Sequence, residues 1–328
     1  MKKKKFLAAV LCALLLAVSF SAAEQIKSCY PALGLRWKEP LSQTQAEALR
    51  TAAGEQEDAP LYPTFWREEQ GQAHTELHQA DEVTAIRFNG EGSLCYPARF
   101  ISGGYPGSED ASGCAISTAL AWQLFGSNDV VGQSLEWEGI SLTVRGVFEE
   151  NERVLLRGCS LADTFSAVEL SGSFEDDRKA QAQELIRQAG LPLPDSMVYG
   201  QSMGTAATGL CFLPLLLAGV LLISECVRRM RNLPPVHRQV LLFGIGTGLA
   251  LCLPFLMEQL PGWMIPAQWS DFSFWPQLGE TLLACLNEWF AVFPCRKDVL
   301  AKQALTILAV CSAAASMLTV ELYNRTRA

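Results

Sequence analysis

Four apolar stretches constrain this chain more than any other feature. A helix needs about 20 apolar residues to cross a hydrocarbon core of about 30 Å, and lipid offers no partner to an unpaired backbone amide. The stretches are Phe6–Ala23, Met203–Ile223, Val240–Met257 and Ala304–Leu322. We therefore predict an integral membrane protein with four transmembrane helices. The first stretch has an alternative reading, because its Lys-rich start and the small residues before Glu24 also suit a cleaved signal peptide.

Charge divides the chain into parts of opposite sign. Residues 24–202 hold 27 acidic and 13 basic side chains, whereas the rest of the chain is net positive. Basic residues beside membrane helices favour the cytoplasm. Three basic clusters agree on one side of the membrane: Lys2–Lys5, then Arg228, Arg229, Arg231 and Arg238, then Arg325 and Arg327. Both termini and the link 224–239 are therefore expected inside, with residues 24–202 and the loop 258–303 outside. Arg296, Lys297 and Lys302 are exceptions, because they lie on the outer side.

These patterns predict three parts. Residues 1–23 form the N-terminal transmembrane helix or signal peptide, and residues 24–202 form an extracytoplasmic α+β domain. Residues 203–328 form an α-helical membrane domain of three further helices. Within the exported part, Ser42 is a typical N-cap for a helix over 42–53, Val83–Phe88 alternates as a half-buried strand does, and Glu175–Gly190 is a helix that ends at a glycine.

Residues 115–150 carry the clearest local pattern. Apolar residues at helical spacing predict a helix over Ser117–Phe125, and Gly126 suits a left-handed C-terminal cap. Ser134–Trp137 and Ile140–Phe148 are β-prone runs, and the Glu138-Gly139 pair between them suits a tight hairpin turn. The predicted order is helix, glycine-containing loop and hairpin.

The same segment resembles a known family. Ala115-Ile116-Ser117, Ala121, Leu124-Phe125-Gly126, Asp129-Val130-Val131-Gly132 and Leu142–Val147 look like the end of a MacB-like periplasmic core domain, and Phe100–Gly107 resembles the segment before it. The resemblance covers residues 98–150 and is to the MacB/FtsX-like permeases of ABC transport systems. In it, Phe125, Gly126, Gly132 and Gly146 stand at structural positions of the signature. The layout of one helix, an external domain and three more helices matches the plan of that family.

The resemblance implies a permease-like subunit in the bacterial cytoplasmic membrane, driven by a separate ABC ATPase. The chain itself has no Gly-x-x-x-x-Gly-Lys-Ser/Thr motif, so ATP hydrolysis would need that partner. The link with Arg228, Arg229, Arg231 and Arg238 is the expected ATPase contact. This link is short and interrupted by Pro234-Pro235, which motivates an alternative: a membrane-anchored binding or scaffold protein without ATPase coupling.

Other motifs are interpreted as structural features of a membrane protein. Gly244 and Gly248 fit the small-x-x-x-small spacing at which membrane helices approach closely, so a homodimer or a related permease is an expected partner. Trp289 and Leu282, on an amphipathic helix over 278–293, are expected toward membrane lipid. The cysteines of the exported regions permit disulfides without fixing a pairing.

Several function classes are not expected. The chain has three histidines and no identifiable Ser/His/Asp set, so we predict no enzyme. His74 and His78 could share a helix face around a metal, but their polar surroundings favour solvated surface. The acidic exported domain argues against nucleic acid. We predict no catalytic residue, no metal site and no cofactor.

Overall fold

The chain forms two compact units, one helical and one of mixed α/β structure. The computed structural model describes residues 2–55, 60–108, 110–161, 163–172, 178–230, 234–257, 265–266, 268, 270–291 and 295–327. The helical unit comprises Met1–Lys27, Ser202–Asn287 and Ala301–Ala328. The α/β domain comprises Ser28–Gln201 together with a second segment, Glu288–Leu300. A short piece from near the C-terminal end is thus part of the α/β domain.

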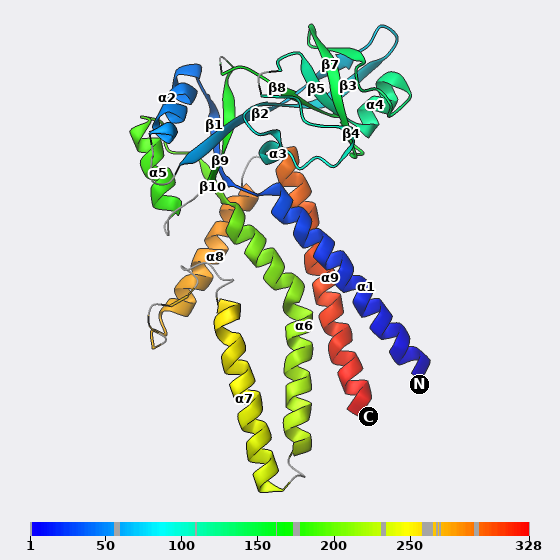
Figure 1. Cartoon of the computed structure of the whole chain (residues 1–328), viewed down its shortest axis with the longest axis vertical. Helices are drawn as coiled ribbons and strands as arrows, with labels where there is room; N and C mark the ends of the chain where they lie inside the picture. The colour runs from blue at the N-terminus through cyan, green and yellow to red at the C-terminus, as the bar shows by residue number, and fades with distance from the viewer. Residues whose placement is uncertain are drawn as a thin grey trace. The chain divides into compact units, whose positions relative to one another are not determined.

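The α/β domain is built on one mixed sheet of ten strands (Figure 1). Most neighbouring strands run antiparallel, but β3 pairs with β8, and β5 with β7, in parallel. The order is β10-β1-β9-β2-β3-β8-β5-β7-β4, with β6 pairing to β2 and β7. The strands are β1 (Leu33–Leu41), β2 (Leu61–His74), β3 (Gln79–Asn89), β4 (Phe100–Gly103), β5 (Gly113–Ser117), β6 (Ser134–Trp137), β7 (Ile140–Phe148), β8 (Val154–Gly158), β9 (Phe165–Gly172) and β10 (Ser196–Tyr199).

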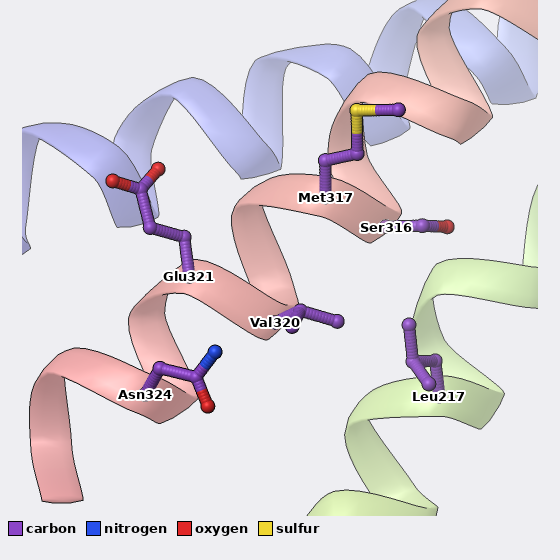
Figure 2. Close-up of a pocket in the computed structure, with 6 residues that line it drawn as sticks. All are labelled: Leu217, Ser316, Met317, Val320, Glu321 and Asn324. Carbon is purple, nitrogen blue, oxygen red and sulfur yellow. The ribbon is translucent and has the colours of Figure 1, made fainter.

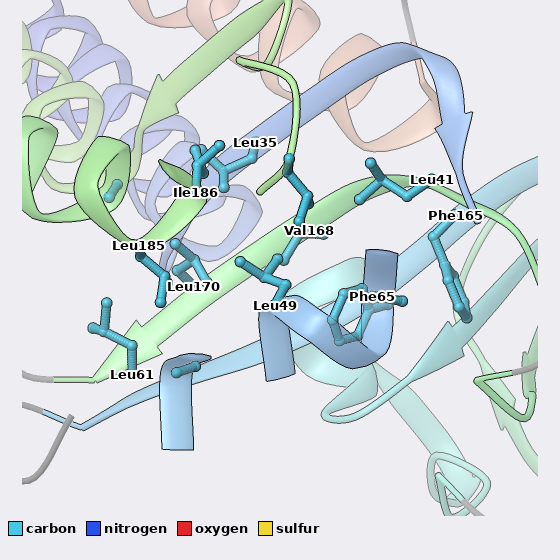
Figure 3. Close-up of a cluster of buried hydrophobic side chains, with 14 of the residues drawn as sticks. Leu35, Leu41, Leu49, Leu61, Phe65, Phe165, Val168, Leu170, Leu185 and Ile186 are labelled. Carbon is cyan, nitrogen blue, oxygen red and sulfur yellow. The ribbon is translucent and has the colours of Figure 1, made fainter. Parts of the chain in front are cut away.

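Helices cover one face of this sheet. Alternate residues of a strand point to opposite faces, so β2 places Phe65 on one face and Trp66 on the other. The Phe65 face packs against helices α2 (Gln43–Gly54) and α5 (Arg178–Gln188), with Leu49 and Leu185 buried between (Figure 3). Further along the sheet, α4 (Thr118–Phe125) buries its apolar side against β3, β5 and β7.

The opposite face carries a different core. Trp66, Phe88, Tyr96 and Phe148 are buried there beside the short helix α3 (Gly92–Cys95). Leu300 packs against the same cluster, although it follows the domain's last strand by about a hundred residues of sequence. This second core is therefore completed by the segment 288–300.

The local elements with strong sequence signals are confirmed. Ser42 caps α2 in a capping box with Gln45, and Ser117 caps α4, which ends at Gly126 in the left-handed conformation. The β6–β7 hairpin has the predicted bounds. Its turn residues Glu138 and Gly139 both have positive φ, 47° and 79°, as a hairpin turn matching the strand twist requires.

The helical unit contains long helices. They are α1 (Lys2–Cys29), α6 (Gly200–Met230), α7 (Pro235–Met257), α8 (Phe274–Ala291) and α9 (Arg296–Arg327), of which α1, α6, α8 and α9 each have an end in the α/β domain. Within the unit, α9 contacts both α1 and α6: Ser312 Oγ donates to Leu210 O at 2.6 Å, and Cys12 Sγ lies 3.9 Å from Ala315 O.

Three helices among the described residues are long and apolar enough to cross a membrane, namely Phe6–Cys29, Ser202–Met230 and Arg296–Asn324. Four transmembrane helices were expected, and three of them are among these candidates. The remaining stretch, 240–257, is helical as part of α7. Its helix begins with polar residues that include Arg238, and several of its side chains lie outside the described set.

Candidate functional site

The first turn of α9 lies inside the α/β domain. Lys297 and Asp298 have no exposed surface, which is rare for charged side chains unless they are paired. They lie on the Trp66 face of the sheet, with Cys295 and Leu300 packed into the adjoining apolar core. Burial of this kind requires partners for every charge.

Lys297 finds its partner on the sheet. Its Nζ donates to Glu169 Oε1 at 2.9 Å and to Leu94 O at 2.6 Å. Arg36 Nη2 donates to the same Glu169 oxygen at 2.8 Å, and Trp66 Nε1 does so at 3.2 Å. One carboxylate oxygen therefore holds donors from β1, β2 and α9 together.

Asp298 is bound from the other side. Tyr30 Oη donates to Asp298 Oδ1 at 2.7 Å, and Trp289 Nε1 donates to Tyr30 Oη at 2.9 Å. Tyr30 follows directly after α1, and Trp289 lies in the last turn of α8. We call the whole set the buried charge cluster; its members are Tyr30, Arg36, Trp66, Glu169, Trp289, Lys297 and Asp298.

The cluster is electrically balanced, with two cations and two carboxylates. Burial by itself would raise the pKa of Glu169, but the Lys297 ammonium and the Arg36 guanidinium outweigh burial and lower it. Burial raises the pKa of Tyr30, and the neighbouring Asp298 carboxylate raises it further. Glu169 is thus held ionised and Tyr30 neutral. Removing one partner of such a buried pair costs about 3–5 kcal/mol, because the other charge stays buried without compensation.

Two more carboxylates bind the start of α9. Glu68 Oε2 accepts the backbone N–H of Arg296 at 2.6 Å, so a negative group meets the positive end of the helix dipole. The Arg296 side chain donates to Glu150 Oε1 at 3.1 Å, and Tyr96 Oη donates to the other Glu150 oxygen at 2.6 Å. Burial raises the pKa of Glu68, and the Arg296 N–H only partly offsets this. Every residue from Arg296 to Asp298 is therefore fixed to the domain.

A glycine makes room for this arrangement. Gly34 on β1 is paired with Glu169 on β9. A Cβ at Gly34 would lie 3.1 Å from Glu169 Oε2 and 3.1 Å from Arg36 Nη1, closer than ordinary van der Waals contact. The small residue therefore lets the buried pair sit against the backbone of β1.

The sequence reasoning did not identify this cluster. In the sequence, Arg296 and Lys297 stand out only as basic residues on the outer side of the membrane, and Glu169 only as part of an acidic domain. One signal was available: Glu169 is a charged residue within the β-prone run Phe165–Leu170. Trp289 was expected toward lipid, and this is wrong, because it is 4% exposed and bonded to Tyr30.

The arginines of the expected ATPase-coupling link stand at helix ends. Arg228 and Arg229, in the last turn of α6, both pair with Glu225. Arg238 is exposed in the first turns of α7. Arg231 lies outside the described residues. Three of the four are thus placed around the α6–α7 connection, and their role stays a prediction.

Among the described residues, nothing packs against the open side of the two expected packing glycines. A Cβ at Gly244 or Gly248 would meet no heavy atom within 4 Å, apart from neighbouring backbone of its own helix. The α7 surface that they form is exposed. Their role in packing stays a prediction.

The resemblance residues occupy structural positions. Phe125 packs at the edge of the core beneath α4. Gly126 and Gly132 have φ of +67° and +90°, a region that favours glycine. A Cβ at Gly146 would lie 2.4 Å from Gly104 O, so no larger residue fits between β7 and the segment after β4.

No group of three metal-ligating side chains occurs among the described residues. His74 ends β2 and His78 lies in the turn before β3, so a shared helix face is wrong. His74 instead pairs with Glu136 at 3.4 Å, and both side chains are largely exposed. Nine cysteines whose side chains the structure describes have free thiols, and burial raises the pKa of Cys114 and Cys159 to about 12.

The helical unit has a shallow groove between α6 and α9 (Figure 2). Leu217 lines it from α6, and Ser316, Met317, Val320, Glu321 and Asn324 line it from α9. Its lining is mainly apolar and lacks a convergent set of polar groups of the kind that orients a small-molecule substrate. The buried charge cluster is therefore the more informative candidate site.

Fold and site together define an integral membrane protein whose helices carry a mixed α/β domain. The domain is similar to the extracellular domain of the noncanonic ABC-type transporter YknZ from Gram-positive bacteria, at 16% identity and a TM-score of 0.39, over 50% of this chain and 96% of that one. It is also similar to the periplasmic region of MacB from Actinobacillus actinomycetemcomitans, at 8% identity and a TM-score of 0.44, over 53% and 90%. No protein-family model and no curated protein matches the chain.

Proposed function

We propose that this chain is a permease-like membrane subunit that passes movement between its membrane helices and its α/β domain. It is not catalytic itself, and a separate ABC-type ATPase supplies the energy. The proposal rests on the sequence resemblance at residues 98–150 and on the way in which the helices join the domain.

The attachment of the helices is the observation that carries the proposal. Helix α1 ends at Cys29 and β1 begins at Leu33. Helix α6 begins at Gly200, the residue directly after β10. The first turn of α9 is held by the buried charge cluster. Each of these three helices is joined directly to the domain along the chain, and we propose that a shift of a helix end is passed to the sheet through these junctions.

Close backbone contact tightens one of these junctions. A Cβ at Gly200 would lie 2.1 Å from Tyr30 O and 2.5 Å from Ala32 O. The start of α6 therefore lies directly against the chain that leaves α1. Such a junction transmits displacement, because packed groups do not deform continuously.

The orientation follows from the basic clusters. We place the α/β domain outside a bacterial cytoplasmic membrane, with α7 as a fourth span and the link 224–239 inside. In this arrangement Arg228, Arg229, Arg231 and Arg238 form the surface that meets the ATPase. Gly244 and Gly248 would face a second copy or a related permease, and the exposed apolar side chains of the spans would face lipid.

The α6–α7 connection favours a second candidate function, that of a membrane-anchored binding or scaffold protein. The α6–α7 connection is short and contains Pro234-Pro235, which leaves little surface for an ATPase. An anchored binding or scaffold protein would need the rigid domain but not the coupling.

Co-purification of the full-length tagged protein from its native membrane separates the two functions. The permease predicts a nucleotide-binding subunit in stoichiometric amount, lost when Arg228, Arg229 and Arg238 are changed to Ser and retained when the exposed Arg99, Arg145 and Arg187 are changed instead. Recovery of the protein without any such subunit would contradict the coupling and favour the scaffold.

A further inference from the structure

The basic residues of α9 favour the wrong orientation. Three of them, Arg296, Lys297 and Lys302, lie within its first turns, whereas Arg325 and Arg327 lie at its C-terminal end. Basic residues within about 15–20 residues of a span favour the cytoplasmic side. In a helix whose N-terminal end is outside, the larger basic group is therefore on the unfavourable side. A contact on the outer side is therefore needed to oppose this bias and hold the N-terminal end of α9 there.

The α/β domain contains a matching site for this helix end. The Glu169 carboxylate accepts a hydrogen bond from Lys297, and Glu150 accepts one from the Arg296 side chain. Glu68 accepts one from the Arg296 backbone N–H. Both Lys297 and Glu169 have no exposed surface, so solvent does not screen their attraction as it screens a surface pair. Two of the three unfavourable cations, Arg296 and Lys297, are thus met by a carboxylate of the domain.

The order of synthesis allows the domain to act on α9. All ten strands precede α9 in the chain, and so do Glu68, Glu150 and Glu169. The sheet with its carboxylates can therefore form before the last helix is made. Only the segment 288–300 is added to it afterwards.

We propose that the α/β domain fixes the membrane orientation of α9 by binding the Arg296–Lys297 pair on the outer side. The ligand of this site is a segment of the same chain: a helix start that carries two adjacent cations. The domain then has a topogenic role in addition to any role in transport. This inference rests on the proposed external location of the domain and not on ATPase coupling.

The test reads the location of the C-terminus of the full-length protein. One fusion carries alkaline phosphatase, which is active outside the cytoplasm, and a matched fusion carries a fluorescent protein that matures inside. We expect Glu68→Gln with Glu150→Gln and Glu169→Gln to raise the ratio of phosphatase activity to fluorescence by roughly threefold or more per full-length chain. The control removes the same charge from the exposed Glu47, Glu82 and Glu149 and should leave the ratio unchanged.

A rescue variant separates pairing from general misfolding. Adding Arg296→Gln and Lys297→Gln to the triple variant removes the bias itself, so the C-terminus should return inside. Cell-free synthesis into membrane vesicles, read by protease protection, provides the same comparison where a variant is degraded in cells. An unchanged ratio in the triple variant, or a failure of the cation changes to restore it, would overturn the proposal.

A third fusion, placed after residue 202, reports the location of the α/β domain. If this reporter lies inside, the proposed orientation of the whole protein fails. If it lies outside while the C-terminus does not respond to the carboxylates, only the topogenic role fails. The two failures are therefore distinguishable.

Discussion

At the scale of single residues, Lys297 is expected to have a large effect on stability, because its charge is fully buried. Lys297→Met keeps the side-chain length but leaves Glu169 with Arg36 as its remaining cation. We expect the free energy of unfolding of the α/β domain to fall by about 3–5 kcal/mol. Urea unfolding of the full-length protein in detergent, followed by tryptophan fluorescence, measures it. Lys38→Met, at an exposed position, is the matched control and should change little.

The buried Glu169 and the half-buried Glu68 give opposite pH dependence. The pKa of Glu169 is lowered from its ordinary value of 4.5, so its stabilising contribution is complete above that value and is lost as the pH falls through the folded pKa. The pKa of Glu68 is raised from the same ordinary value, so the folded state is favoured below it and this advantage is lost as the pH rises through the folded pKa.

Measuring the free energy of unfolding as a function of pH checks the predicted direction of both effects. Glu169→Gln should flatten the loss of stability that the wild type shows as the pH falls below about 4.5, whereas Glu68→Gln should remove a gain in stability that the wild type shows as the pH falls toward about 4.5. Chemical unfolding at several pH values gives the slopes. Equal slopes in the wild type and Glu169→Gln would contradict the ionised state that we assign to Glu169.

Gly34 tests how closely the cluster is packed. Gly34→Ala places a methyl group 3.1 Å from both Glu169 and Arg36, and we expect a loss of about 1–3 kcal/mol. Gly54→Ala is the control, because it adds a methyl group at the end of α2 with nothing within 4 Å. Thermal unfolding should rank the two variants in that order; equal midpoints would mean that the cluster relaxes around the added atom.

At the scale of elements, Ser117 joins a helix to the sheet. Its Oγ accepts the N–H of Leu120 at 3.2 Å as the cap of α4, and the N–H of Val154 on β8 at 3.1 Å. Ser117→Ala should therefore cost more than the typical cap value of about 1 kcal/mol, because a buried strand amide also loses its partner. Ser42→Ala removes a cap at an exposed position and should stay near that value. The difference between the two unfolding free energies is the measurement.

The elements also show which parts of the structure follow from sequence. The helix α4, its ending at Gly126 and the Glu138-Gly139 turn depend on residues a few positions apart, and all were predicted. Lys297 and Glu169 are 128 residues apart, and Tyr30 and Asp298 are 268 apart. No local pattern encodes such pairs, so the candidate site was missed.

The same reasoning explains the error at helix α8 and why the span at helix α7 stays a prediction. Trp289 has the amphipathic spacing of a lipid-facing residue, but its indole N–H has a buried acceptor in Tyr30, a tertiary contact that spacing does not reveal. The stretch 240–257 is helical, but it is not among the three described helices that are long and apolar enough to cross a membrane. A fourth span at α7 therefore stays a prediction.

At the scale of the whole molecule, three membrane-length helices lead directly along the chain into or out of one sheet domain. The segment 288–300 is central to it, because this piece of the C-terminal half completes the second core of a domain encoded mostly by residues 28–201. If helix movement reaches the domain, it does so through this segment and through the two junctions at β1 and β10.

Hydrogen exchange of the full-length protein in a lipid nanodisc tests this claim most directly. The account predicts that amides of 295–300 are protected as strongly as those of β9, because the same cluster holds both, and that Lys297→Met releases 295–300 before the helix-covered face of the sheet. Lys38→Met should leave both patterns unchanged. Rapid exchange of 295–300 in the wild type, while β9 stays protected, would contradict the account, since it would mean that α9 opens independently of the domain.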